Sequence, residues 1–311
     1  MVLKPAGWLY GFGARLRRVV VRPVKASVPV LCVGNFVAGG AGKTPVALSL
    51  GKRMLAQGHK VHFLSKGYGG RVPGPFRVDS GVHTAAEVGD EPLLLSSVAT
   101  TWISRNRSAG VRAAAEGADV VIMDDGFQNP SVEKDMSILV ADGGYGFGNG
   151  RVIPAGPLRE TIHSAVERAN AIIVIGEDKA HVLSHPALWK TPLPVLKAVV
   201  KPGPEAESLT GKAVSAFAGL GNPEKFFQTL RELGSEVKAT HAFSDHHFYS
   251  KEDIGRLKAE AKEKGFQLVT TEKDAMRLSA EDLEGIEVLT ISLDWADEAS
   301  LDDLLKSLMG D

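Results

Sequence analysis

Short runs of apolar, often β-branched residues alternate along the chain with longer stretches in which apolar positions recur every three or four residues. The short runs predict buried strands, and the longer stretches predict helices with one apolar face. In the first half of the chain the expected strands are 28–33, 60–64, 119–123, 137–141 and 171–175, and the clearest helices are 45–57 and 109–117. Strands and helices that alternate in this order predict a parallel sheet covered by helices on both faces.

A proline-rich stretch separates this first unit from a second one. Residues 181–209 contain five prolines and one expected strand, 195–200. The second, smaller α/β unit is expected to hold strands 213–218, 236–242, 267–271 and 287–291, with helices 223–233 and 251–264. A chain of 311 residues is long for a single core, which also favours two domains. We therefore expect a first domain at 26–185, a linker at 186–210 and a second domain at 211–311.

The N-terminal segment, 1–25, has a helical pattern of its own. At about 100° per residue, one arc about 120° wide holds Trp8, Leu9, Phe12, Leu16, Val19 and Val20, and a neighbouring arc holds Lys4, Arg15, Arg18 and Arg22. This is the build of a helix that lies in a membrane interface, with its cations toward anionic lipid headgroups. A helix packed on its own domain is the alternative, and glycines at 7, 11 and 13 weaken any helix here. No apolar run reaches the roughly 18 residues of a membrane-spanning helix.

Charge is distributed unevenly, although the net charge is only −1. The first 78 residues hold 13 of the 36 Lys and Arg residues and no acid, since the first acidic residue is Asp79. Such a cationic block can face nucleic acid, anionic lipid or phosphorylated small molecules. Aromatic residues make up only 6% of the chain and no Arg-Gly or basic repeat is present, so we expect no nucleic-acid partner. The single cysteine, Cys32, lies in the apolar run "VPVLCV" and is expected to pack as a small hydrophobe, which suits a reducing cytoplasm.

A glycine-rich turn, "GGAGKT", follows the first expected strand and precedes a helix, which is the context of a phosphate-binding loop. Small residues at Gly39, Gly40 and Gly42 allow backbone N–H groups to turn inward around phosphate oxygens. Lys43 is expected to bridge the β- and γ-phosphates of a nucleotide, and Thr44 is expected to bind Mg²⁺. An ordinary glycine turn with an exposed lysine is the alternative.

Two adjacent acids, Asp124 and Asp125, follow the expected strand 119–123. Because this strand should lie beside the strand that carries the phosphate loop, these acids are expected where Mg²⁺ and its waters need oxygen ligands. The alternative is a simple Asp-Asp-Gly turn. Tyr68, in the "GYGG" turn after the second strand, is expected at the same edge of the sheet, or else as an ordinary surface tyrosine.

Candidates for acid–base chemistry lie in two further motifs. In "GDEPLLL", Asp90 is either the N-cap of a helix or a carboxylate that orients an acceptor hydroxyl, and the residues by themselves favour the cap. In "SDHH", an acid precedes His246 and His247. No further ligands follow at a regular spacing, so proton transfer is favoured over a zinc site.

Two charged segments complete the candidates. The stiff loop 147–160 ends in Arg159 and Glu160, whose charges are expected to face a ligand rather than solvent. The segment "TTEKDAMRL", 270–278, is expected to be a capped helix start without a direct catalytic role.

Together these motifs resemble one family, the tetraacyldisaccharide 4'-kinases of lipid A synthesis. The resemblance rests on "VGNFVAGGAGKTP", "SKGYGG", "GDEPLLL", "DDGFQN", "FGNGRVIPAGPLRE", "FAGLGNPEKFF", "SDHH" and "TTEKDA", in this order along nearly the whole chain. It implies an α/β fold of two α/β/α sandwich domains joined by a hinge-like linker, with a P-loop NTPase-like parallel sheet that binds ATP in the N-terminal domain. It also implies transfer of the γ-phosphate of ATP to the 4'-hydroxyl of a tetraacylated glucosamine disaccharide 1-phosphate.

The resemblance further implies a place and a set of site residues. The place is the cytoplasmic face of the inner membrane of a Gram-negative bacterium, and no obligate protein partner is inferred. Asp90 and His246 are implied to act together as the general base, in which Asp90 takes the proton of the sugar hydroxyl. Lys43 is the third implied catalytic residue. The implied Mg²⁺ ligands are Thr44, Asp124, Asp125 and Glu160, and the implied nucleotide contacts are Gly39, Gly40, Gly42, Lys43, Thr44, Tyr68, Arg107, Gln128 and Arg159.

Three positions depart from the expected patterns, and two rival functions remain. Val37 stands where the usual phosphate loop has glycine, Lys66 where the family has arginine, and Asn129 where the family usually has histidine. One rival is a switch ATPase of the variant Walker A class that needs no lipid acceptor. The other is a non-enzymatic module that binds anionic lipid, which would have no use for Asp124 and Asp125.

Overall fold

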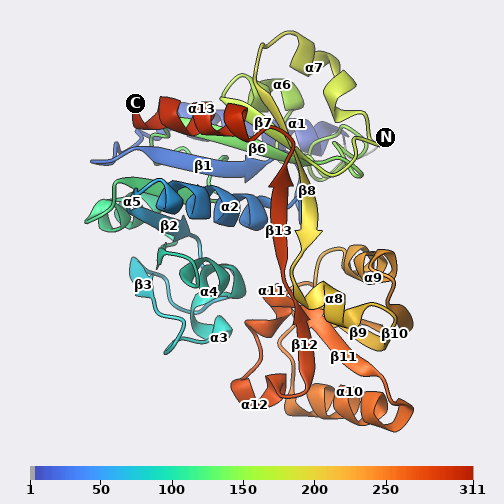
Figure 1. The fold of residues 1–311 in the computed structure, drawn as a ribbon. Helices are drawn as coiled ribbons and strands as arrows, with labels where there is room; N and C mark the ends of the chain where they lie inside the picture. The colour runs from blue at the N-terminus through green and yellow to red at the C-terminus, as the bar shows by residue number, and fades with distance from the viewer. Residues whose placement is uncertain (1–3, 311) are drawn as a thin grey trace.

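The computed structural model describes residues 4–310, and within the first helix it leaves aside the side chains at 4–6, 8–10 and 14. Two sheets organise the chain into a large and a small domain, and Figure 1 shows them one above the other. The large sheet has nine strands in the order β13 (Ile291–Trp295), β8 (Val195–Pro202), β7 (Ala171–Ile175), β6 (Met136–Asp142), β1 (Val30–Asn35), β5 (Val120–Asp124), β2 (Val61–Ser65), β4 (Thr100–Ile103) and β3 (Phe76–Val78). Neighbours pair in parallel except β3 with β4 and β13 with β8.

The central strands are buried on both faces, which explains why their sequences are continuous apolar runs. In β1, Leu31 and Val33 pack toward one face of the sheet, and Val30 and Cys32 pack toward the other. The first face is covered by α2 (Lys43–Ala56), α4 (Asp90–Ser96) and α13 (Glu298–Met309), and the second by α5 (Arg107–Ala115) and α6 (Ile162–Val166). The expected α/β domain with a sheet between two layers of helices is therefore confirmed, and the sheet is parallel except at its two edges.

The small domain repeats this design with a four-stranded, fully parallel sheet. Its strand order is β10 (Glu236–Ala242), β9 (Ala213–Ala218), β11 (Gln267–Thr271) and β12 (Ile286–Leu289). Side chains of α8 (Glu205–Leu209) and α9 (Pro223–Glu232) pack on one face, and those of α10 (Lys251–Lys264) pack on the other. Short helices complete the two domains: α3 (Ala85–Val88), α7 (Pro186–Trp189), α11 (Glu272–Ala275), α12 (Ala280–Leu283) and the 3₁₀ turn η1 (Val182–Ser184).

The last residues of the chain return to the large domain, which corrects the expected boundary of 211–311. The expected strand at 287–291 divides into β12 and β13, and Figure 1 shows β13 running back toward the large domain beside β8. There α13 packs on the same face of the sheet as α2, since Leu301 and Leu305 are buried in the large core and Arg53 of α2 binds Asp302. The domains are thus joined by two antiparallel strands rather than by one linker.

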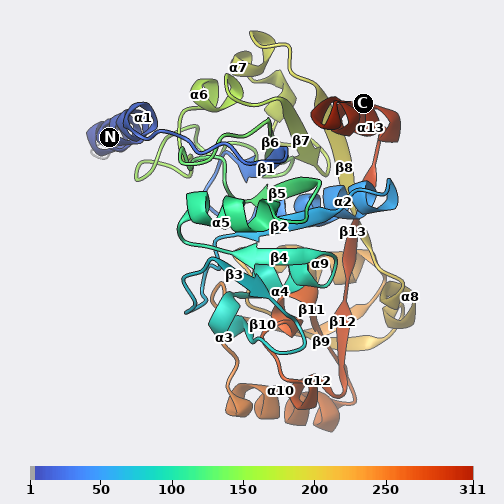
Figure 2. The same ribbon diagram turned by 90° about the vertical axis from the view of Figure 1, so that its left-hand side faces the viewer.

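The first helix, α1 (Lys4–Val20), lies on the outside of the large domain, and Figure 2 shows it projecting from that domain. Its apolar side chains are exposed at Phe12, Leu16, Val19 and Val20, from 53% at Leu16 to 84% at Val19. Trp8 and Leu9, expected on the same face, lie outside the described side chains. Within the described part of the chain, no helix is long and apolar enough to cross a bilayer.

Candidate active site

A cavity of about 1030 Å³ lies between the two domains and is lined by residues of both. The large domain contributes the glycine-rich loop 39–44 and the carboxyl ends of β2, β5 and β6. The small domain contributes its loops at 220–222, 245–246 and 271–273. The position agrees with the general behaviour of α/β proteins, in which ligands bind outside the carboxyl ends of the parallel strands.

The loop 39–44 has the backbone of a phosphate-binding turn. Gly42 has φ +83° and precedes the N-terminus of α2, and this left-handed backbone favours glycine. Val37, which replaces the usual first glycine, is buried in the core below the loop. The N–H of Ala38 donates to Pro157 O at 2.8 Å, so the segment 147–160 supports the loop from outside. The structure thereby explains how the loop forms without a glycine at position 37.

Asp124 is a buried carboxylate beside this loop. Thr44 Oγ1 donates to Asp124 Oδ2 at 3.0 Å, and Asp124 Oδ1 has no hydrogen-bond partner among the described residues. Burial, followed by the charge of Glu91, raises the pKa of Asp124 to about 7, although Lys43 acts against this shift. An unpaired, buried carboxylate oxygen next to a threonine hydroxyl fits a divalent cation with oxygen ligands. Among residues 4–310, no group of three or more His, Cys, Asp or Glu could hold a metal ion by itself.

Asp125 is held by cations instead. Arg159 donates to both of its carboxylate oxygens, at 2.7 and 3.1 Å, and Lys43 Nζ lies 3.9 Å from Oδ2. Burial would raise the pKa of Asp125, but Lys43 and Arg159 outweigh burial and lower it. Asp125 also has φ +52°, a left-handed conformation that is uncommon outside glycine and occurs often at functional sites.

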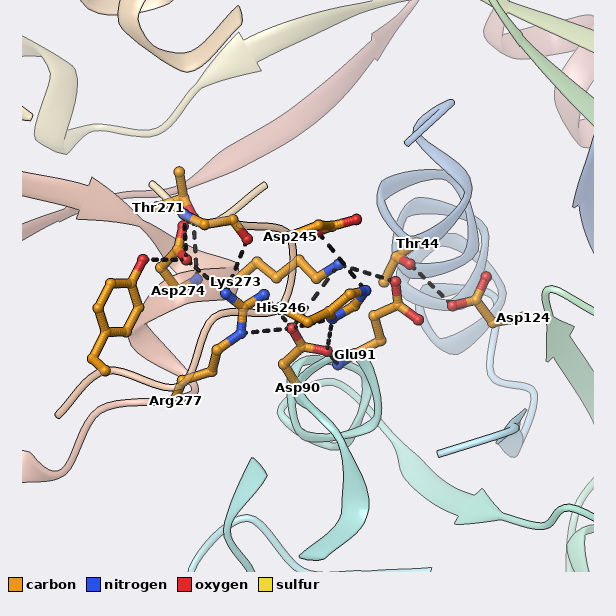
Figure 3. Close-up of polar contacts among 12 residues, drawn as sticks. Thr44, Asp90, Glu91, Asp124, Asp245, His246, Thr271, Lys273, Asp274 and Arg277 are labelled. Carbon is orange, nitrogen blue, oxygen red and sulfur yellow. Dashed lines mark hydrogen bonds and ion pairs between the residues drawn. The ribbon is translucent and has the colours of Figure 1, made fainter. Parts of the chain in front are cut away.

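Asp90 and His246 meet across the domain boundary, as Figure 3 shows. His246 Nδ1 lies 3.0 Å from Asp90 Oδ2 and 3.2 Å from Oδ1, and the ring of Tyr68 lies 5.1 Å from the imidazole ring. His246 has φ +57° and is, after Asp125, the second non-glycine residue at the site with a left-handed backbone. The cavity is lined by His246 and Tyr68, whereas Asp90 lies behind them in a small adjoining pocket. Asp90 is not the N-cap of α4, which is Gly89.

Besides Asp90, three of the expected site residues support the cavity from outside rather than line it. Glu160 is buried, and its carboxylate accepts from Arg18 at 3.0 Å and from Arg168. Arg107 donates to the backbone oxygens of Asp124 and Asp125, at 3.3 and 3.4 Å. Gln128 donates to Asn35 O at 3.2 Å. These contacts hold α1, the acid pair and the end of β1 in place.

Other charged residues at the site were missed by sequence reasoning. Arg277 and Lys273 approach Asp90 from the small domain, and Lys225 of α9 contacts Asp142 at the end of β6. The motif "TTEKDAMRL" gave a signal for the first two, because positions 273 and 277 are one helical turn apart and carry the same charge. The motif does not indicate the partner of these cations, because Asp90 lies in the other domain.

The fold and the site define a class, the P-loop proteins that bind nucleotides and carry a second domain over the nucleotide cavity. A family model described as Tetraacyldisaccharide-1-P 4'-kinase matches residues 1–310. Proteins called tetraacyldisaccharide 4'-kinase from Parvibaculum lavamentivorans and Rhodospirillum centenum are each 49% identical to this chain. The alignments cover 100% and 99% of this chain and 89% and 91% of those proteins.

A solved structure agrees with these sequences. The crystal structure of an "apo" form of LpxK from Aquifex aeolicus in complex with ATP has a TM-score of 0.80 and 27% sequence identity to this chain. The structural alignment covers 99% of this chain and 98% of the A. aeolicus chain. The chain therefore belongs to the tetraacyldisaccharide 4'-kinase family of lipid A biosynthesis. This confirms the family that the motifs resemble.

Proposed function

We propose that the chain transfers the γ-phosphoryl group of ATP to the 4'-hydroxyl of a tetraacylated glucosamine disaccharide 1-phosphate. The relatives are named for a 4'-kinase, and the A. aeolicus structure is described as a complex with ATP. The observation that carries the proposal is the shared cavity. It is lined by Lys43 and Thr44 of the large domain and by His246 of the small domain. Phosphoryl transfer needs such alignment and charge neutralisation more than covalent help from the protein.

The phosphate end of ATP fits the loop 39–44. Backbone N–H groups at the N-terminus of α2 favour anions, and Lys43, the first residue of that helix, supplies a full positive charge. Arg159 adds a second cation to the cavity while it holds Asp125. The ribose and adenine would then lie toward the small domain and the strands β8 and β13. Apolar side chains there line the rest of the cavity: Val200 of β8, Ile291 of β13 and Leu289 of β12 in the small domain.

Asp124 and Thr44 are the residues that we propose hold Mg²⁺. The free, buried oxygen of Asp124 beside the Thr44 hydroxyl fits this ion, whereas Asp125 and Glu160 are already paired with arginines. Mg²⁺ bound there would offset the negative charge of the phosphates. Asp125 then contributes through Arg159 and Lys43, and Glu160 through the anchoring of α1.

His246 is the group that we propose takes the proton of the acceptor hydroxyl. Asp90 accepts hydrogen bonds from the small domain and stays ionised, so the proton of their shared contact resides on His246 Nδ1. Nε2 remains as the ring nitrogen that can accept a proton, and it lies 3.8 Å from Asp245 Oδ1. This assigns the proton to His246 and the orientation of the ring to Asp90, which reverses the roles that the resemblance implies.

The helix α1 is the segment that we propose contacts the membrane. Its apolar side chains at Phe12, Leu16, Val19 and Val20 have no cover among the described residues, and exposed arginines lie beside them. Arg18 does not take part, because it binds Glu160 and Ser164. An acylated sugar phosphate is held in a bilayer, so its kinase must act at the surface of an anionic membrane, here the cytoplasmic face of the inner membrane.

Label transfer tests the kinase reaction. The protein is incubated with radiolabelled ATP, Mg²⁺ and a tetraacyl disaccharide 1-phosphate, and we expect label in the lipid with wild-type protein and almost none with Lys43→Ala. ATP hydrolysis that does not need the lipid would instead favour a switch ATPase. Membrane binding without any use of ATP would favour a lipid-binding module.

Vesicle sedimentation tests the membrane contact. Val19→Glu should shift the protein from vesicles with anionic lipid to the supernatant, because it places a charge on the apolar face of α1. Val82→Glu is the matched control, since Val82 is equally apolar and exposed but lies in a loop after β3. Equal binding of both variants would refute the proposed role of α1.

A further inference from the structure

Asp90 belongs to the large domain, yet its partners come from the small domain. Arg277 Nε donates to Asp90 Oδ2 at 2.8 Å, and Arg277 Nη2 donates to the same oxygen. His246 Nδ1 lies 3.0 Å and Lys273 Nζ 4.0 Å from that oxygen. Figure 3 shows Arg277, Lys273 and His246 gathered around Asp90. The Asp90 carboxylate is therefore a contact between the two domains, and it lies directly beside His246.

Arg277 cannot turn away from Asp90 easily, because its remaining nitrogen is also engaged. Nη1 donates to Asp274 Oδ1 at 2.8 Å and to Gly219 O at 3.0 Å. Asp274 is fully buried and in turn accepts from Thr271 Oγ1 at 2.6 Å and from the hydroxyl of Tyr249 at 2.8 Å. The side chain of Arg277 is itself 1% exposed. A guanidinium braced in this way presents a fixed fork to its carboxylate.

We propose that Arg277 is a positioning residue for phosphoryl transfer: it holds Asp90 ionised and in one orientation, so that Asp90 aligns His246 only while the two domains are docked. The inference rests on the proposed function and extends it to a residue that does not line the cavity. Arginine suits the task because it keeps its proton at any pH at which the protein is folded.

The behaviour of buried carboxylates explains why such a residue is needed. Burial alone raises the pKa of a carboxyl group, and Asp124 in this molecule shows that effect. Burial acts on Asp90 as well, but the hydrogen bond from His246 and the charges of Lys273 and Arg277 outweigh it and lower the pKa of Asp90 far below its usual range. The charged groups that surround this centre are His246, Lys273 and Arg277, with Glu91, Asp245 and Asp274 beyond them.

Variants at 277 test the proposal by the label-transfer assay. R277Q should lower kcat by about 30-fold or more while KM for ATP changes by less than about threefold, because the nucleotide site is untouched. The decline of kcat on the acid side should move to higher pH, because Asp90 then gains a proton more readily. R277K keeps the charge but loses the fork, so it should recover part of kcat and restore the acid side. R231Q is the matched control, since Arg231 forms an exposed pair with Glu224 on α9, and its kcat should equal that of wild type.

A double-mutant cycle covers the case in which R277Q fails to fold. Kinetics of R277K, D90N and the double variant are compared, and R277K should cost little further activity once Asp90 is neutral. Independent, multiplying losses in the cycle would overturn the proposal. A folded R277Q protein with the kcat and pH profile of wild type would overturn it as well. In either case, transfer of label by wild-type protein shows separately that the proposed function holds.

Discussion

Asp90 and Asp124 are both buried carboxylates, Asp124 in the lining of the cavity and Asp90 in the small pocket beside it, but their surroundings are opposite. Asp124 has one hydroxyl partner and one free oxygen, and its pKa is raised to about 7. Asp90 is nearly as buried, yet Arg277, His246 and Lys273 surround it and lower its pKa. Among the described residues no cationic side chain donates a hydrogen bond to Asp124, whereas Arg277 and Lys273 of the small domain both contact Asp90.

This difference separates two ways of making a buried charge tolerable. A carboxylate that awaits a metal ion must be left without strong protein partners, because a fixed arginine would occupy the place of the ion. A carboxylate that orients a histidine must instead stay ionised throughout, which fixed cations secure. Asp124 accepts a hydrogen bond only from Thr44 of its own domain, whereas Asp90 accepts hydrogen bonds from Arg277 of the small domain.

Neutralising Asp124 should have the largest effect. Asp124→Asn should lower kcat/KM by about 1,000-fold, because the ion that offsets phosphate charge loses its charged ligand. The measurement is label transfer over a series of Mg²⁺ concentrations, with wild-type protein and a chelator as the reference for full metal loss. If Asp124→Asn kept the Mg²⁺ dependence and rate of wild type, the proposal that Asp124 binds Mg²⁺ would be wrong.

Removing the imidazole should have the next largest effect. His246→Ala should lower kcat by about 100-fold with little change in KM for ATP, because it removes the proton acceptor without changing the phosphate loop. His247→Ala serves as the control, since His247 lies 3.3 Å from Asp253 within the small domain and does not line the cavity. Equal losses for the two variants would contradict a special role of His246.

Removing the two hydrogen bonds from Arg159 to Asp125 should lower activity by a smaller factor. Arg159→Lys should lower kcat/KM by about tenfold or less, because a lysine keeps the charge beside Asp125 and loses the two-pronged contact. Steady-state kinetics in ATP measure this change. A loss as large as that of Asp124→Asn would mean that the contact between Arg159 and Asp125 matters as much as Asp124 itself, which would contradict the secondary role proposed for Asp125.

Opposite dependences of stability on pH should give the smallest effect, about 2 °C in melting temperature. The raised pKa of Asp124 stabilises the nucleotide-free fold below about pH 4, and this contribution is lost as the pH rises to about 7. The lowered pKa of Asp90 stabilises the fold above about pH 4, and this contribution is lost at lower pH. Thermal melting of Asp124→Asn and Asp90→Asn, each compared with wild type from about pH 2.5 to about pH 8, measures the two slopes. If the contributions of Asp124 and Asp90 to stability changed with pH in the same direction, the two carboxylates would not have opposite surroundings.

Much of the fold followed from local patterns. The strands at 171–175, 213–218, 236–242 and 267–271 were predicted with the bounds that the structure has. The end of the chain was not, because the expected strand at 287–291 covers two strands that belong to different sheets. No local pattern distinguishes them, since the break at Thr290 depends on which sheet edge each half meets.

The candidate site divides in the same way. The loop 39–44 and the acid pair were found from the sequence, because the glycines and the lysine lie between a strand and a helix and the two acids lie at the end of a strand. The places of Glu160, Arg107 and Gln128 could not be found, because their partners lie on other elements.

The sequence by itself determined the order of strands and helices, the phosphate loop and the family, since these depend on residues that are neighbours along the chain. Only the tertiary structure decided that Arg277 meets Asp90 over a separation of 187 positions and that Glu160 anchors α1. The physical reason is that the charge state of a buried carboxylate is set by whichever groups the fold brings within a few ångströms.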